Sequence, residues 1–381
     1  MFGKAKREEV KQEIAQLREQ FGDISVEEFK EGGWLVQLIQ TVLQRRSKKV
    51  SAEYFRKKYR CVDNERVAYR LKKTAAKYTG ASGAVAAAAV SAGELSTFVS
   101  GGATWAVVGS SMVGELAYIT QRQVKLIHDI AVVLEADLNT EDPEDVMALL
   151  WLALDVDIYE KASGVFLKAG PRGAAYLGRK ALRNGMRQAM QQVAKKFGGT
   201  VLARKLTERT LLKLIVPGIN MPIAYGVNRW FTNKLGNKAI ERLKHRSLMV
   251  RPLRQMEDAD RLSQLLTLPI LFHVGISDEP KDIDSRLVEM QAVTARKMQV
   301  TDDEDDTLRD WVDTTYESFL ERVDVAVSPN TATALLDVGV GAHLLSESNG
   351  KSREKLDALA RVLDAGNVND RIRFMRKRYL S

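Results

Sequence analysis

The sequence predicts an all-α protein, a glycine- and alanine-rich bundle of helical hairpins joined to a second, smaller helical domain. Proline is scarce, at 8 of 381 residues, and alanine, leucine, glutamate, lysine, arginine and glutamine are abundant. That mixture favours helix over strand. Apolar residues also recur every three or four positions in long stretches, which is typical of amphipathic helices. With 45% hydrophobic and 28% charged residues, the chain has the composition of a folded protein.

Charge is distributed along the chain in blocks of alternating sign. The formal net charge is +8 over residues 1–80, −7 over 81–150, +13 over 151–260 and −5 over 261–381. A chain of this length usually forms more than one hydrophobic core. The change of sign near residue 260 is therefore the clearest domain boundary.

We predict three parts from this pattern. These are an N-terminal helical segment at 1–50, a helical domain at 51–255 and an acidic helical domain at 256–381. The single cysteine, Cys61, excludes an internal disulfide and any zinc site built from several cysteines. It also indicates a reducing compartment.

Three helices are predicted before residue 80. The first, residues 4–21, places its apolar residues at helical spacing. Ser25 with Glu28 forms a capping-box pattern that starts the second. The third is expected from about Ser51 to Lys77. Its basic residues are interpreted as a solvated face: Arg56, Lys57, Lys58 and Arg60.

Small and apolar residues dominate residues 79–114, where Glu94 is the only charge. Small residues at this density let helix backbones approach closely. Residues 95–114 are uncharged and formally long enough to cross a bilayer, but Gly101 and Gly102 predict a turn. We therefore predict a tightly packed helical hairpin, either buried or dipping into a lipid interface, rather than a membrane span.

A second apolar segment, 211–227, is interrupted by Pro217, Gly218 and Pro222, and a basic helix follows it. Gly218 is expected to shape this second hairpin. Aromatic residues at the junction of apolar and basic sequence are typical of a lipid interface. The predicted membrane or lipid contacts are Arg229, Trp230, Phe231, Lys234 and Lys238. The alternative is a buried helix pair whose basic face is solvated.

Two segments of the chain also match a family pattern. In the first, a glycine-rich stretch precedes a long amphipathic helix and a helix start at Asp142 and Pro143. The matching helix positions are Gln123, Leu126, Ile127, Ile130 and Ala131. In the second, the matching positions are Pro217, Gly218, Asn228, Thr232, Gly236 and Ala239.

With these motifs, residues 50–248 resemble the EcsC family. The chain departs from the family where it has VLEAD, since members often have Tyr-Gly after the first helix. EcsC-like proteins have no established enzymatic chemistry. The resemblance implies a bacterial, membrane-linked role tied to secretion or envelope function.

The acidic C-terminal part contains a pattern that recurs after 70 residues. Leu265, Leu266 and His273 recur as Leu335, Leu336 and His343, which suggests an internal duplication. This part resembles the TerB, or tellurite-resistance, type of helical domain, whose loops carry acidic runs. The matching acids are Asp278, Glu279, Asp282 and Asp284. They could hold a divalent cation, or they are the acids that favour the first turn of a helix.

No catalytic motif can be assembled from the sequence. The four histidines are scattered and no HExxH occurs, and the NGKS at 349–352 lacks the glycine that a phosphate-binding loop requires. The GVG at 339–341 lacks a third glycine, and no GxSxG elbow is present. We therefore expect a protein that is not an enzyme and needs no cofactor, apart from the divalent cation considered above.

The predicted partner is an anionic membrane surface or lipid, because the +13 block coincides with the second apolar hairpin. Protein partners are expected too, and one alternative is a scaffold whose TerB-like domain recruits stress-response proteins. Nucleic acid is less favoured, because no recognition motif accompanies the basic charge. The N-terminus has no secretory signal, so we predict a cytoplasmic protein, peripheral at the inner face of the membrane. The oligomeric state stays open.

Overall fold

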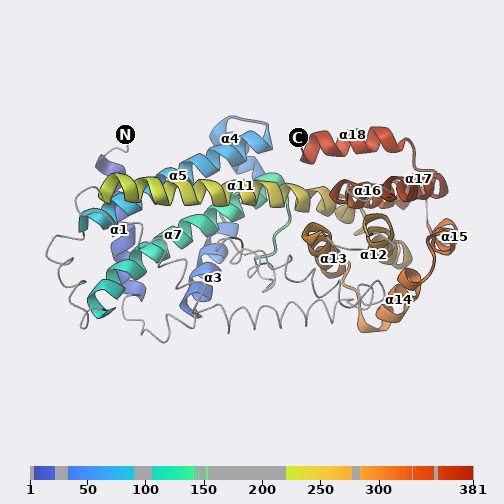
Figure 1. The fold of residues 1–381 in the computed structure, drawn as a ribbon, viewed down its shortest axis with the longest axis horizontal. Helices are drawn as coiled ribbons and strands as arrows, with labels where there is room; N and C mark the ends of the chain where they lie inside the picture. The colour runs from blue at the N-terminus through green and yellow to red at the C-terminus, as the bar shows by residue number, and fades with distance from the viewer. Residues whose placement is uncertain are drawn as a thin grey trace. The chain divides into compact units, whose positions relative to one another are not determined.

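The structure, a computed structural model, describes residues 4–21, 33–89, 105–140, 142, 145, 152, 220–276, 284–327, 329–346 and 351–380. Every regular element within these ranges is a helix, which confirms the predicted all-α fold (Figure 1). The described chain forms two compact units, and the division between them falls within the long helix α11, Asn220–Gln255. The first unit holds the described residues up to 152 and 220–240, and the second holds those from 241 onward.

The first unit is organised around α7, Trp105–Leu134, which is buried from Gly114 to Thr120. Three longer helices pack against it: α1 (Lys4–Phe21), α3 (Gly33–Ser47) and α5 (Asn64–Ala89). The short helix α4, Ala52–Tyr59, packs on α5 and α7. Two of the helices around α7 therefore come from the first 50 residues of the chain.

The prediction of a single helix over residues 51–77 was wrong, because this stretch contains α4 and the first half of α5. Arg60 ends α4 in the left-handed region, with φ at 48°. The Asp63 carboxylate then accepts hydrogen bonds from the N–H groups of Glu65 (2.9 Å) and Arg66 (3.3 Å). A short acidic side chain in this position satisfies N–H groups that have no partner within the helix, so it starts a new one.

Helices α5, α7 and α11 extend into the small-residue segments that were predicted as separate hairpins. α5 continues to Ala89, and α7 begins at Trp105. Pro222 lies in the first turn of α11, where a backbone N–H has no partner within the helix, so it does not interrupt the helix as predicted. The three predicted hairpin glycines lie outside the described residues: Gly101, Gly102 and Gly218.

Glycines in α5 allow this helix to approach α11 closely, as the small-residue pattern predicts. A Cβ atom at Gly83 would lie 2.5 Å from the carbonyl oxygen of Ala224, and one at Gly80 would lie 2.9 Å from the Tyr225 ring. Glycine is therefore the residue that fits between the two backbones. Among the described helices, none combines the length and the apolar character needed to cross a membrane.

The second unit is centred on α12 (Arg261–Gly275) and α16 (Pro329–Leu345), which pack against each other. The other helices of this unit are α13 (Ser285–Lys297), α14 (Asp305–Asp313), α15 (Tyr316–Ala326), α17 (Ser352–Leu363) and α18 (Val368–Tyr379), with a 3-10 turn at Asp302–Glu304. The core that they share is apolar and includes Leu266, Ile270, Leu335 and Leu336, all fully buried.

The leucine pair and the histidine that recur after 70 residues fall at similar places in α12 and α16. Both leucines of each pair are buried, and each histidine lies in the last turn of its helix. The Nε2 atom of His273 lies 2.9 Å from the carbonyl oxygen of Trp311, and Nδ1 of His343 lies 3.1 Å from the Ser352 hydroxyl. Both histidines thus have hydrogen-bond partners within the unit. The duplication itself stays a prediction.

Candidate lipid-contact surface

Helix α11 has two different faces between residues 224 and 241. One face is buried and carries small or uncharged residues at helical spacing: Ala224, Asn228, Thr232, Leu235, Gly236 and Ala239. The exposed side carries Trp230, Lys234 and Lys238, and Arg229 is exposed at its edge; we name these four residues the α11 contact face. Four of the five predicted contact residues are therefore exposed on one helix.

Trp230 is the most exposed aromatic side chain in the described residues, at 58%. The Lys234 ammonium lies 5.7 Å from the centroid of its ring, and the Arg229 guanidinium lies 5.8 Å from that of Tyr225. Both are pairs four residues apart, so the helix itself holds a cation beside each ring. Phe231, the fifth predicted residue, is half-buried and packs edge-on against Trp230, with 4.9 Å between ring centroids.

A third aromatic–cation pair, from α5, adjoins the contact face. The Lys72 ammonium donates to the side-chain oxygen of Asn237 at 2.6 Å and lies 4.6 Å from the Tyr69 ring centroid. Tyr69 is 40% exposed, whereas the stem of Lys72 lies flat across Gly236, where a Cβ would come within 2.5 Å of it. Burial, and then the charge of Lys73, lower the pKa of Lys72. The sequence pattern did not indicate that this pair lies beside α11, because Lys72 and Asn237 are 165 residues apart in the chain.

Buried polar side chains of α5, α7 and α11 form hydrogen bonds across the helix interface, and we name this cluster the seam. The Thr79 hydroxyl donates to the Thr232 hydroxyl at 2.8 Å, and the Gln123 amide donates to the same oxygen at 3.3 Å. The Asn228 amide donates to the Glu115 carboxylate at 3.0 Å. All five side chains are buried. Hydrogen bonds of this kind are directional, so they fix how α11 is rotated against α5 and α7.

The seam unites residues from both segments of the family pattern. Gln123 belongs to the first segment, while Asn228, Thr232 and Gly236 belong to the second. Gln123, Asn228 and Thr232 each form a hydrogen bond across the helix interface, and Gly236 leaves room for the stem of Lys72. With this face buried, Trp230 must point to the opposite side.

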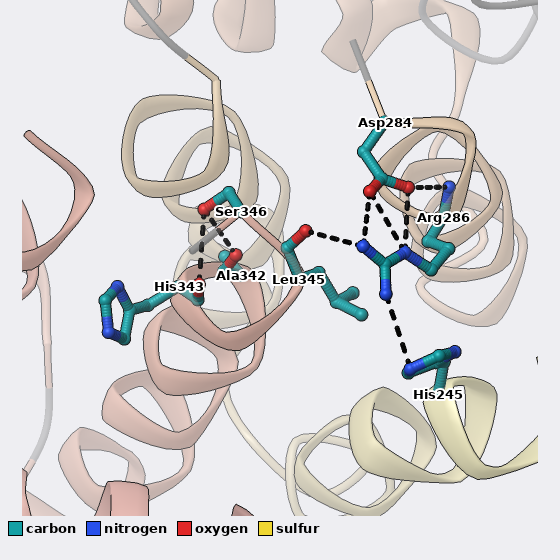
Figure 2. Close-up of polar contacts among 7 residues, drawn as sticks. All are labelled: His245, Asp284, Arg286, Ala342, His343, Leu345 and Ser346. Atoms are coloured by element: carbon teal, nitrogen blue, oxygen red, sulfur yellow. Dashed lines mark hydrogen bonds and ion pairs between the residues drawn. The ribbon is translucent and has the colours of Figure 1, made fainter. Parts of the chain in front are cut away.

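In the second unit, Arg286 joins three helices (Figure 2). Its guanidinium donates to the carboxylate of Asp284, approaches Nε2 of His245 at 3.5 Å and donates to the carbonyl oxygen of Leu345 at 3.5 Å. Asp284 also accepts from the backbone N–H of Arg286 at 2.8 Å, which caps α13. Burial alone would raise the pKa of Asp284, but the hydrogen bonds from Arg286 outweigh it and lower the pKa.

This arrangement bears on the predicted cation site. Asp284 serves as a helix cap and as the partner of Arg286, which is the alternative that the sequence left open. The other three acids, Asp278, Glu279 and Asp282, lie outside the described residues. Within the ranges that the structure describes, no three histidine, cysteine, aspartate or glutamate side chains are grouped as metal ligands.

The C-terminal helix α18 carries a second basic and aromatic surface that sequence analysis missed. Phe374 is 44% exposed, and the guanidinium groups of Arg251 and Arg378 lie 5.6 Å and 6.0 Å from its ring centroid. Further along the helix, Arg376 and Lys377 are exposed as well. The basic charge of this helix is not apparent from the net charge of −5 over residues 261–381, because acidic residues elsewhere in that block outweigh it.

Comparison with protein families, with curated proteins and with solved structures finds no match to this chain. The resemblances to the EcsC family and to TerB-like domains therefore stay predictions. What the protein does has to follow from its own side chains, and the α11 contact face combines exposure, an aromatic ring and basic residues.

Proposed function

We propose that this protein is a non-enzymatic, peripheral lipid-binding protein that attaches to an anionic membrane surface through the α11 contact face. In the cell it would lie at the inner face of a bacterial membrane and act in envelope stress, secretion or defence, as the EcsC resemblance implies. The observation that carries the proposal is the exposed Trp230 on a helix that also exposes Arg229, Lys234 and Lys238, with the Lys234 ammonium 5.7 Å from the Trp230 ring centroid.

The energetics favour reversible attachment. An indole ring is stable at the boundary between headgroups and acyl chains, because its N–H can bond to water or lipid while its body is apolar. Each lysine or arginine near an anionic surface contributes about 1 kcal/mol, so the three cations contribute about 3 kcal/mol. Inserting the exposed part of Trp230 adds about 2 kcal/mol. A sum of about 5 kcal/mol corresponds to weak, reversible binding.

Flotation with lipid vesicles tests the proposal. Full-length protein is mixed with neutral or anionic vesicles at low and at high salt, and the bound fraction is measured. The test variant combines Trp230→Ala, Lys234→Gln and Lys238→Gln. The matched control combines Tyr54→Ala, Lys57→Gln and Lys58→Gln on α4, where an exposed tyrosine and a lysine are also four residues apart, with 5.5 Å between the ammonium and the ring centroid.

We expect binding only to anionic vesicles, weaker at high salt, and a loss of about tenfold or more in the α11 variant. The control variant, with the same change in charge, should stay within about twofold of the unmodified protein. Equal losses in the two variants would mean that charge alone, and not this face, governs binding. Absence of flotation at low salt would refute the proposal.

A protein scaffold is the alternative, and the exposed α18 surface is the observation that favours it. A partner with an acidic surface would complement its arginines and Phe374. Should vesicles fail to bind, stable co-purification with an acidic protein would support this alternative. A salt-sensitive gel shift with an oligonucleotide would instead support nucleic-acid binding.

A further inference from the structure

A cavity of about 200 Å³ lies between α1, α3 and α7 in the first unit. One part of its lining is apolar and comes from Leu17, Leu38 and Val42, each of which is buried. Cavities that hold drug-sized ligands measure about 300–1,000 Å³. This one is therefore of a size for a small group or for the headgroup of a larger molecule.

The polar part of the lining carries four cations and no carboxylate. Arg46 is neutralised, because its guanidinium donates to both oxygens of Asp129, at 2.8 Å and 2.7 Å. The side chains of Arg45, Lys49 and Lys125 form no hydrogen bond or ion pair with any residue that the structure describes. Three positive charges thus line one cavity with no hydrogen-bonded or ion-paired counter-charge among the residues that the structure describes.

Lys125 is the cation in the least favourable surroundings. The two acids that act on it are already engaged, Asp129 by Arg46 and Glu13 by Arg122 at 2.7 Å. Burial, followed by the charge of Arg122, lowers the pKa of Lys125. An anion bound in the cavity would offset both effects.

Gln121 supplies a second, independent indication of a ligand. Its side-chain oxygen is buried and finds no hydrogen-bond partner among the described residues, and Gln121 is one of the residues that line the same cavity. Buried polar atoms are nearly always paired, so an unpaired one at a cavity points to a missing partner. A half-turn of the amide would instead present its NH₂ group, which can donate to an anion.

We propose that this cavity binds a phosphate ester, with its phosphoryl oxygens held by Arg45, Lys49 and Lys125 and its organic part against the apolar wall. A phosphoryl group carries a charge of about −1.5 to −2 and three acceptor oxygens, which matches three uncompensated cations better than a single carboxylate does. The ester could be a lipid headgroup or a free metabolite. None of the lining residues belongs to α11, so this site and the membrane proposal can fail separately.

Calorimetric titration of the full-length protein tests the site. The probes are inorganic phosphate, glycerol 3-phosphate, dihexanoyl phosphatidic acid below its micelle concentration and dihexanoyl phosphatidylcholine. The test variant combines Arg45→Gln, Lys49→Gln and Lys125→Gln. The control combines Arg7→Gln, Lys73→Gln and Lys77→Gln, three exposed residues of the same types and the same total charge.

We expect the anionic esters to bind the unmodified protein and the control, and to bind the test variant about tenfold or more weakly. Phosphatidic acid binding about tenfold tighter than glycerol 3-phosphate would identify a lipid headgroup, and equal binding would identify a free phosphate ester. Lack of binding by every anionic ester, or equal weakening in both variants, would overturn the proposal. The α11 variant should keep this binding, whatever it does to flotation.

Thermal unfolding in phosphate-free, low-salt buffer tests whether the test variant loses binding only because it is unfolded. Since the three cations repel one another without a ligand, their replacement should raise the unfolding midpoint. Addition of glycerol 3-phosphate should raise the midpoint of the unmodified protein and leave that of the test variant unchanged. A lower midpoint for the variant, with no ligand effect on the unmodified protein, would assign these residues a purely structural role and refute the site.

Discussion

His245 is kept uncharged by its surroundings. Burial, and then the nearby Arg286 guanidinium, lower the pKa of its imidazole from 6.5 to about 4. In the unfolded chain the imidazole takes up a proton near pH 6.5, so the unfolded state binds that proton first as the pH falls. The stability that neutral His245 allows is therefore complete above pH 6.5 and is lost as the pH falls from 6.5 towards about 4.

A His245→Gln variant tests this linkage. We expect the unmodified protein to lose up to about 2 kcal/mol of unfolding free energy between pH 7 and pH 4.5 through this group, and the variant to lose correspondingly less. Urea unfolding at the two pH values measures the difference. Asp284 contributes little to this difference, because its pKa is lowered from an ordinary value of 3.8 and its effect on stability therefore appears below that pH. An identical loss in both proteins would contradict the assignment.

Thr232 is the common acceptor of the buried seam. A Thr232→Val substitution would leave the Gln123 amide without its acceptor, while Thr79 could turn to the carbonyl oxygen of Ala76, now at 3.3 Å. We expect a loss of about 1–2 kcal/mol in unfolding free energy, measured by urea titration. The control is Thr74→Val at an exposed position of α5, which should change stability by less than about 0.5 kcal/mol. Equal effects would mean that the seam hydrogen bonds contribute little.

At the scale of elements, the close approach of α5 to α11 decides what each glycine tolerates. Gly83 faces the backbone of α11, and its added methyl group would have no direction in which to move. Gly226 lies on the exposed side of α11, with nothing within 4 Å of a Cβ placed there. The same substitution should therefore have opposite effects at the two positions.

We expect Gly83→Ala to lower the unfolding free energy by about 1–3 kcal/mol through overpacking. Gly226→Ala should raise it by up to about 1 kcal/mol, because alanine is the better helix former. Thermal or urea unfolding of the two variants in parallel provides the measurement. A stabilising Gly83→Ala would show that the two helices lie farther apart than described here.

At the scale of the whole molecule, two cores share one helix. The first core includes Ile127 and the second includes Leu336, and both side chains are fully buried. Units with separate cores usually unfold in separate steps. The shared helix α11 is the covalent element that could couple them.

Replacement of one core residue in each unit distinguishes independent unfolding of the two units from unfolding that is coupled through α11. Ile127→Ala should lower the unfolding midpoint of the first unit and Leu336→Ala that of the second, each by about 2–5 kcal/mol in free energy. Calorimetry should then resolve two transitions that move independently. A single transition that moves in both variants would mean that α11 couples the two cores into one cooperative unit.

The local sequence pattern predicted that these segments are helical better than it predicted where each helix begins and ends. The spacing of apolar residues indicated helices throughout, and the mixture of basic residues with Trp230 marked the exposed face of α11. The break between α4 and α5 was missed, because Asp63 and the left-handed Arg60 act through backbone hydrogen bonds that apolar periodicity does not record. The cavity was missed too, since its cations are ordinary surface residues when each helix is considered alone.

The sequence by itself determined the helical class, the small-residue character of the α5 and α7 segments and the basic, aromatic character of α11, because these depend on neighbours within a few positions. Only the tertiary structure decided that Gln123 meets Thr232, that Lys72 crosses Gly236 and that Lys125 shares a cavity with Arg45 and Lys49. The physical reason is that such contacts join helices from distant parts of the chain. They depend on the rotation and separation of packed helices, which no local pattern specifies.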